Sequence, residues 1–188
     1  DRETDNMTDI DFKNFYINWH NRAVKFAQYY VLVEEDAENI VQDVFMRIYE
    51  RLEDFDRATF LGSYLFTAIK NECLKTLQHR IAEQKAMSDY RSDYVLPMQL
   101  KYDSLEVMDT NFRDEQSIEE LLQHAIDSLP EKCRQIFVMH KLEGKKQKEV
   151  AEALGISEST VQVQMGIAYR KLRKELKDCM PLFIFLFL

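Results

Sequence analysis

The segment "EVAEALGISESTVQVQMGIAYRKLRKEL", residues 149–176, constrains the fold of this chain more than any other stretch. Its pattern predicts two helices separated by a short break at Gly155, Ile156 and Ser157. Glycine can adopt the left-handed backbone that ends a helix, and serine is a favoured N-cap for the next helix. Apolar residues are spaced to lock the two helices at a steep angle; they are Val150, Leu154, Ile156, Val161 and Met165. The segment is therefore predicted to be a helix-turn-helix.

The second helix of this segment has the composition of a DNA-reading helix. Its first half offers side chains suited to base edges: Ser159, Thr160, Gln162, Val163 and Gln164. Cations suited to phosphates lie before it and in its second half: Lys146, Arg170, Lys171 and Arg173. The alternative is a hairpin of an ordinary helical bundle, whose basic end suits the helix dipole. The combination of features favours DNA binding.

Composition and periodicity predict an all-α protein. The 188 residues include only 4 Gly and 3 Pro, and no run alternates between polar and apolar residues as a half-buried strand would. The stretch "DAENIVQDVFMRIYERL" repeats apolar residues at steps of three and four, as a helix with one buried face does. Residues 12–30 and 61–77 show the same spacing, so three helices are expected to share a core.

We expect two small helical domains joined by a flexible linker. The expected boundaries are 9–80 for the first domain, 81–116 for an acidic linker, 117–178 for the second domain and 179–188 for an apolar tail. The net charge is -8, but residues 81–130 carry about −7 and residues 144–177 about +4. An acidic linker would suppress unassisted, nonspecific DNA binding, because phosphate attraction dominates that binding.

The tail "CMPLFIFLFL" is far shorter than the roughly 20 residues of a membrane-spanning helix. Three interpretations stay open from the sequence. The tail could pack on the second domain, form a loose apolar end, or dock an inhibitor or the other domain.

No pattern in the sequence indicates an enzyme, a cofactor or a metal site. There is no glycine-rich phosphate loop and no nucleophile paired with a base, and the three cysteines and four histidines lack ligand spacing. The acidic start "DRETDNMTDIDF" lacks the order of a signal peptide, and the sparse cysteines fit a reducing compartment, so a cytoplasmic location is expected.

Two blocks of the sequence resemble a known family. "SLPEKCRQIFVMHKLEGKKQKEVAEALGISESTVQVQMGIAYRKLRKEL" resembles the promoter-reading domain of bacterial extracytoplasmic-function (ECF) sigma factors of the sigma-70 family. "DAENIVQDVFMRIYERL" followed by "SYLFTAIKNECLKTL" resembles their N-terminal domain. The resemblance implies three partners: the clamp helices of the largest subunit of core RNA polymerase, promoter DNA, and an anti-sigma factor that is often membrane-anchored.

The resemblance also implies roles for individual residues. Four would face core polymerase: Asn39, Gln42, Asp43 and Tyr49. A loop over residues 55–62 would capture a flipped base of the −10 element, and the following helix would contact DNA through Tyr64, Lys70, Asn71, Lys75 and Arg80. The residues suited to bases and phosphates in the helix-turn-helix would read the −35 element. Tyr64 and Lys75 depart from the family's usual residues, so its usual promoter sequence is not carried over.

Two alternatives remain beside the sigma factor. A stand-alone helix-turn-helix regulator would bind DNA tightly without polymerase, and it leaves the first block unexplained. A helical adaptor protein would have no effect on DNA.

Overall fold

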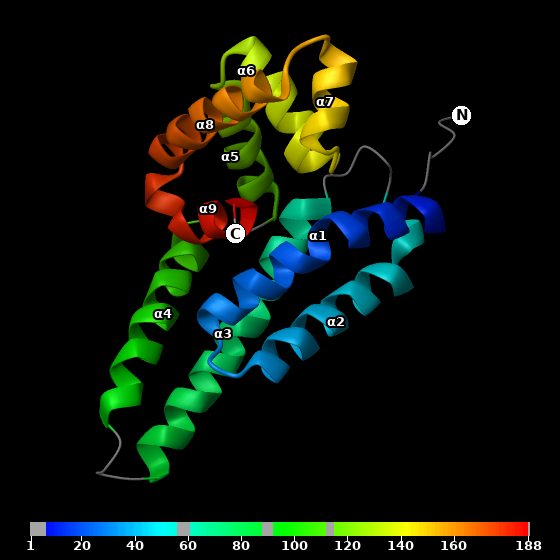
Figure 1. The fold of residues 1–188 in the computed structure, drawn as a ribbon. Helices are drawn as coiled ribbons and strands as arrows, with labels where there is room; N and C mark the ends of the chain where they lie inside the picture. The colour runs from blue at the N-terminus through cyan, green and yellow to red at the C-terminus, as the bar shows by residue number, and fades with distance from the viewer. Residues whose placement is uncertain (1–6, 56–60, 88–91, 112–114, 188) are drawn as a thin grey trace.

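The computed structural model describes residues 7–55, 61–87, 92–111 and 115–187. Every regular element in these ranges is helical, which confirms the all-α prediction (Figure 1). The structure places α1 (Asp9–Tyr30), α2 (Glu34–Glu50) and α3 (Leu61–Met87) against one another, with a short 3-10 turn, η1 (Leu52–Asp54), after α2.

The first three helices form because each buries one apolar face. Thr8 starts α1 with a capping box: its hydroxyl accepts from the Asp11 amide, and the Asp11 carboxylate accepts from the Thr8 amide. In α2 the buried residues recur at helical spacing: Ala37, Ile40, Val41, Val44, Phe45 and Ile48. The predicted helices of the first domain are thus present.

The expected flexible linker takes a different form. Residues 81–87 continue α3, and α4 (Ser92–Asn111) packs beside α3 (Figure 1). Met98 and Leu105 are buried, and they lie seven residues apart on one side of α4. With only these two buried residues and Pro97 inside the helix, the local sequence pattern of α4 is weak. Packing against α3 therefore stabilises a helix that the sequence did not predict.

Residues 115–175, all of which the structure describes, form four α-helices and a π-helical turn. They are α5 (Glu115–Asp127), α6 (Glu131–Phe137), η2 (Val138–Leu142), α7 (Gln147–Leu154) and α8 (Glu158–Glu175). Helix α8 packs against both α6 and α7, and η2 continues α6 toward the loop that precedes α7. This is the architecture of a helix-turn-helix with supporting helices.

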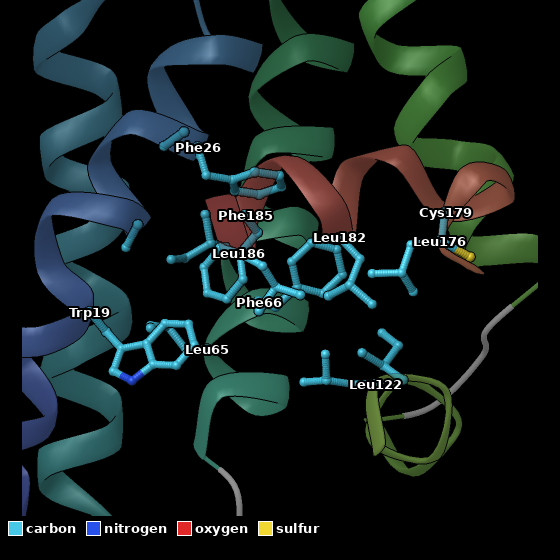
Figure 2. Packing of buried hydrophobic residues seen from close by; sticks show 14 of the residues in the cluster. Trp19, Phe26, Leu65, Phe66, Leu122, Leu176, Cys179, Leu182, Phe185 and Leu186 are labelled. Atoms are coloured by element: carbon cyan, nitrogen blue, oxygen red, sulfur yellow. The ribbon is translucent and has the colours of Figure 1, made fainter. Parts of the chain in front are cut away.

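The apolar tail forms a short helix inside the molecule. After a 3-10 turn, η3 (Lys177–Cys179), the chain enters α9 (Met180–Phe187), which packs against α1, α4 and α8. Figure 2 shows side chains from α1, α3, α5 and α9 meeting around Leu182, Phe185 and Leu186. The buried residues of both halves therefore belong to one continuous hydrophobic cluster that runs from Trp19 to Leu186.

Candidate functional site

The turn between α7 and α8 has the geometry that the sequence predicts. Gly155 adopts φ 64° and ψ 36°, in the left-handed region where a side chain would be strained. The amide of Ile156 donates to the Ala151 carbonyl at 3.0 Å, and the Ser157 hydroxyl accepts from the Thr160 amide at 3.1 Å. Val150, Val161 and Met165 are buried where the helices meet. The predicted helix-turn-helix is confirmed.

The predicted DNA-reading residues lie on the exposed side of this motif. Lys146, Ser159, Thr160, Gln162, Val163, Arg170, Lys171 and Arg173 are all exposed. Gln164 is half-buried, and its backbone carbonyl accepts from the Cys133 thiol at 3.3 Å. Gln162 donates through Nε2 to Oε1 of Gln147 at 3.3 Å, which holds the start of α7 beside α8. Helix α8 thus presents amides and hydroxyls at one end and guanidinium groups at the other.

Sequence reasoning missed Gly166 on the same face. It lies between Val163 and Arg170 at helical steps of three and four, and a Cβ added there would meet nothing within 4 Å. Packing within this chain therefore does not require glycine. A glycine inside a helix lowers the free energy of unfolding by about 0.5–1 kcal/mol relative to alanine. A glycine on the predicted reading face was therefore the signal that could have marked this position as functional.

The predicted polymerase-binding residues share the exposed face of α2. Asn39, Gln42, Asp43 and Tyr49 are exposed, opposite the buried stripe of the helix. The centre of the Tyr49 ring lies 5.1 Å from that of the Phe12 ring in α1, and Tyr49 is still 47% exposed. Sequence reasoning missed Met46, which is 56% exposed and lies between Asp43 and Tyr49 on this face. An exposed methionine among polar groups is a common feature of protein-binding surfaces.

Glu72 of α3 connects the α2 surface to the predicted −10 surface. Its Oε1 accepts from Arg47 Nη1 at 3.0 Å and from Lys75 Nζ at 3.2 Å. Burial alone would raise the pKa of Glu72, but the hydrogen bonds from Lys75 and Arg47 outweigh it and lower that pKa. A carboxylate thus restrains one of the predicted DNA-contacting lysines.

The structure brings together only part of the predicted −10 surface. Tyr64 is half-buried with its ring edge-on to Phe55 at 5.2 Å, and Asn71 and Lys75 are exposed on the same face of α3. Arg80 lies off that face and pairs with Asp36 of α2 at 2.9 Å. Of the predicted base-capturing loop, residues 56–60 lie outside the described part of the chain.

The expectation for Lys70 does not fit this structure. Its side chain is 1% exposed, so it does not face DNA here. Position 70 falls on the helical stripe that also holds Phe66, Cys73 and Leu77, all buried. The role of Lys70 was carried over by position from the family resemblance, and the burial of this position in α3 does not fit that role.

Within the described ranges, no group of three or more His, Cys, Asp or Glu side chains could hold a metal ion. The helices described here also include none with the length and apolar character needed to cross a bilayer. The site consists of exposed polar and cationic side chains on rigid helices, which suits recognition by contact.

Comparison with known families identifies both halves of the chain. The family model of Sigma-70 region 2 matches residues 15–86, and that of Sigma-70, region 4 matches residues 119–172. Together the two matches cover more than half of the 188 residues.

Similar curated proteins cover most of the chain. The ECF RNA polymerase sigma factor SigX of Bacillus subtilis is 23% identical over 172 residues, which are 88% of this chain and 84% of SigX. The RNA polymerase sigma factor SigZ of the same organism is 23% identical over 90% of this chain and 89% of its own length. The ECF RNA polymerase sigma factor SigE of Mycolicibacterium smegmatis is 27% identical over 74% of this chain and 51% of SigE.

Two solved structures share 19% identity with the chain. One is CnrH in complex with the cytosolic domain of CnrY, with a TM-score of 0.33 over 92% of this chain and 91% of CnrH. The other is the sigma factor RpoE in complex with the anti-sigma factor NepR from Bartonella quintana, with a TM-score of 0.36 over 89% of this chain and 97% of that one. With region 2 matched in the first helices and region 4 in the helix-turn-helix half, the chain belongs to the sigma-70 family and is an RNA polymerase sigma factor of the extracytoplasmic-function type.

Proposed function

We propose that this chain directs promoter-specific initiation through three separate surfaces. The exposed face of α2, with Asn39, Gln42, Asp43, Met46 and Tyr49, binds the clamp helices of core RNA polymerase. The face of α3 that carries Tyr64, Asn71 and Lys75 contacts the −10 element. The exposed face of α8 reads the −35 element.

The observation that carries this proposal is the arrangement of α8. All the predicted base-contacting residues of its first half except Gln164 are exposed, and so are the arginines and lysine of its second half. Amide and hydroxyl groups can pair with base edges, whereas Arg170 and Arg173 can neutralise phosphates. An ordinary bundle hairpin would not need this polarity along one exposed face.

The remaining expectations form one consistent account. The first domain spans 9–80 and the second 117–178, with 81–116 as a largely helical connection and 179–188 as the apolar tail. The protein acts by binding and not by catalysis, and it works in the cytoplasm. An anti-sigma factor, soluble or membrane-anchored, holds it inactive by covering the polymerase-binding surface.

Co-purification with core RNA polymerase on a sizing column tests the proposal. The chain should elute with the polymerase in equal amount, and the Gln42→Ala/Asp43→Ala variant should not. A matched control is Gln99→Ala/Asp103→Ala, which removes a Gln–Asp pair joined at 2.9 Å on α4. The control should bind like the unmodified chain.

The same experiment separates the sigma factor from the alternatives. If the folded chain does not bind polymerase but binds DNA by itself at nanomolar concentration, the chain is a stand-alone regulator. If it binds neither, the adaptor is correct.

A further inference from the structure

Helix α9 is an apolar helix of eight residues that is inserted between the two sigma regions. Its side chains Leu182, Phe185 and Leu186 are each 1% exposed. The Phe185 ring stacks on Trp19 at 5.4 Å and contacts the rings of Phe26 at 5.5 Å and Phe66 at 5.2 Å. One side of α9 is therefore embedded in α1 and α3, which belong to region 2 (Figure 2).

The end of the same helix contacts region 4. The Phe187 ring lies 4.8 Å from the Tyr169 ring of α8, edge-on at 90°, and 6.0 Å from the Phe137 ring of α6. Phe187 also packs on Phe183 of its own helix at 4.4 Å. A single short helix thus contacts the aromatic side chains of both regions.

Two hydrogen bonds between described residues join α1 to region 4. Arg22 of α1 donates through Nη1 to the Lys141 carbonyl at 2.8 Å. Asn18 of α1 donates through Nδ2 to the Glu143 carbonyl at 3.5 Å, the limit of a hydrogen bond. These contacts join α1 to the turn around η2 and do not involve α9.

The charges at this junction oppose its closure. Burial, and then the neighbouring cations Arg22 and Lys25, lower the pKa of Lys141 to about 8. Like charges this close repel one another, and burial removes the water that would screen them. The apolar contacts of α9, together with the packing of α5 on α3, therefore hold the regions together against these like charges.

We propose that α9 is an intramolecular latch, which holds regions 2 and 4 in a closed arrangement and must release Trp19, Phe26 and Phe66 before the regions can separate. The covalent connection supports this: η3 joins α9 directly to α8, so region 4 cannot move away from region 2 while Phe185 stays in place. The latch is a property of the free chain. Its consequence for transcription rests on the proposed function, in which region 2 and region 4 contact two separate promoter elements and must therefore move apart.

Trp19 is the only tryptophan of the chain, so its fluorescence reports directly on the latch. The test variant is Phe185→Ala/Leu186→Ala, and the control is Met180→Ala, which alters an apolar residue of α9 that is 39% exposed. A second control, Phe187→Ala, removes the ring contacts with Tyr169 and Phe137 but leaves Phe185 against Trp19. Quenching of Trp19 by acrylamide, the radius of gyration from small-angle X-ray scattering and far-UV circular dichroism are measured on each.

The latch predicts that Phe185→Ala/Leu186→Ala expands, with several-fold stronger quenching of Trp19 and unchanged helix content. Phe187→Ala and Met180→Ala should keep the Trp19 quenching of the unmodified chain, because Phe185 stays in place in both. An unchanged radius of gyration in Phe185→Ala/Leu186→Ala would overturn the proposal. A cooperative loss of helix content in that variant would also overturn it, because α9 would then be part of one indivisible core.

Binding to core polymerase separates this inference from the proposed function. The Phe185→Ala/Leu186→Ala variant should bind polymerase several-fold more tightly, because it no longer has to open. If that variant expands but Gln42→Ala/Asp43→Ala leaves polymerase binding unchanged, the latch stands and the assigned polymerase surface is wrong.

Discussion

The ring of Phe185 stacks on the indole of Trp19 with 5.4 Å between ring centroids and 22° between ring planes. The two residues are far apart in sequence, and Arg22 covers the same indole with its guanidinium carbon 4.9 Å from the ring centroid. Closing so long a loop costs conformational entropy, although that cost grows only slowly with loop length. The burial of apolar surface on α9 offsets it.

Substitutions in region 2 and in α9 should lower the free energy of unfolding by different amounts. Phe66→Ala should lower the free energy of unfolding by about 3–5 kcal/mol, because Phe66 is fully buried within region 2. Phe185→Ala should cost less, because region 2 stays folded once the latch opens, and the loss cannot exceed the free energy of latching. Urea denaturation followed by circular dichroism measures both; equal losses would mean that the chain unfolds as one unit.

Gly166, inside α8, and Gly155, in the turn before it, form a matched pair for testing how the backbone conformation of a glycine affects stability. A Cβ at either position would meet nothing within 4 Å, so only the backbone distinguishes them. Gly166→Ala should raise the free energy of unfolding by about 0.5–1 kcal/mol, because it lies inside a helix. Gly155→Ala should lower it by about 1–2 kcal/mol, because φ is 64° there.

The effect of Gly166→Ala on promoter binding should have the opposite sign to its effect on stability. An added methyl group in the middle of the exposed face would keep DNA from approaching the helix, so the polymerase complex should bind promoter DNA several-fold more weakly. Competition binding with a labelled promoter fragment measures this. Unchanged affinity together with raised stability would show that DNA does not approach Gly166.

Local signals predicted the parts of the fold whose contacts are local. The turn at Gly155 and Ser157 could be predicted because the left-handed glycine and the N-cap act within a few residues. The buried face of α2 could be predicted because its apolar residues recur with the helical period. The exposed residues of α8 followed from the same reasoning.

The parts that sequence reasoning could not predict depend on distant partners. Helix α4 is ordered by contact with α3, which its two buried residues Met98 and Leu105 do not reveal. The tail is apolar on all sides, so its period could not show which surface it packs against. Lys70 was expected to contact DNA because of the family resemblance, although its position in α3 matches the buried stripe.

Lys141 should make the closed arrangement dependent on pH. It faces Arg22 and Lys25 of α1, and its ammonium lies 5.7 Å from the centre of the Tyr169 ring of α8. Its pKa is about 8 in the closed form, against 10.5 for an exposed lysine, so the open form binds more protons between these values. Raising the pH from about 8 to 10 should therefore favour the closed form, and below about 8 the dependence should fade.

Acrylamide quenching of Trp19 as a function of pH measures this effect. Quenching should fall as the pH rises, and the Lys141→Met variant should show weak quenching with a flat profile. The hydrogen bond from Arg22 should survive, because it uses the backbone carbonyl of residue 141. An identical pH profile in the variant would assign the effect to another group.

Met46 provides the sharpest test of the polymerase-binding face. A glutamate placed there would put a charge into the centre of the proposed contact, where desolvation is costly, and should weaken binding to core polymerase at least ~10-fold. Because Met46 is 56% exposed, Met46→Glu should change the free energy of unfolding by no more than about 0.5 kcal/mol. Leu100→Glu on α4 is the matched control, since Leu100 is 62% exposed on a different helix. Equal weakening by both substitutions would show a general effect of added negative charge, whereas weakening by Met46→Glu alone would assign the contact to α2.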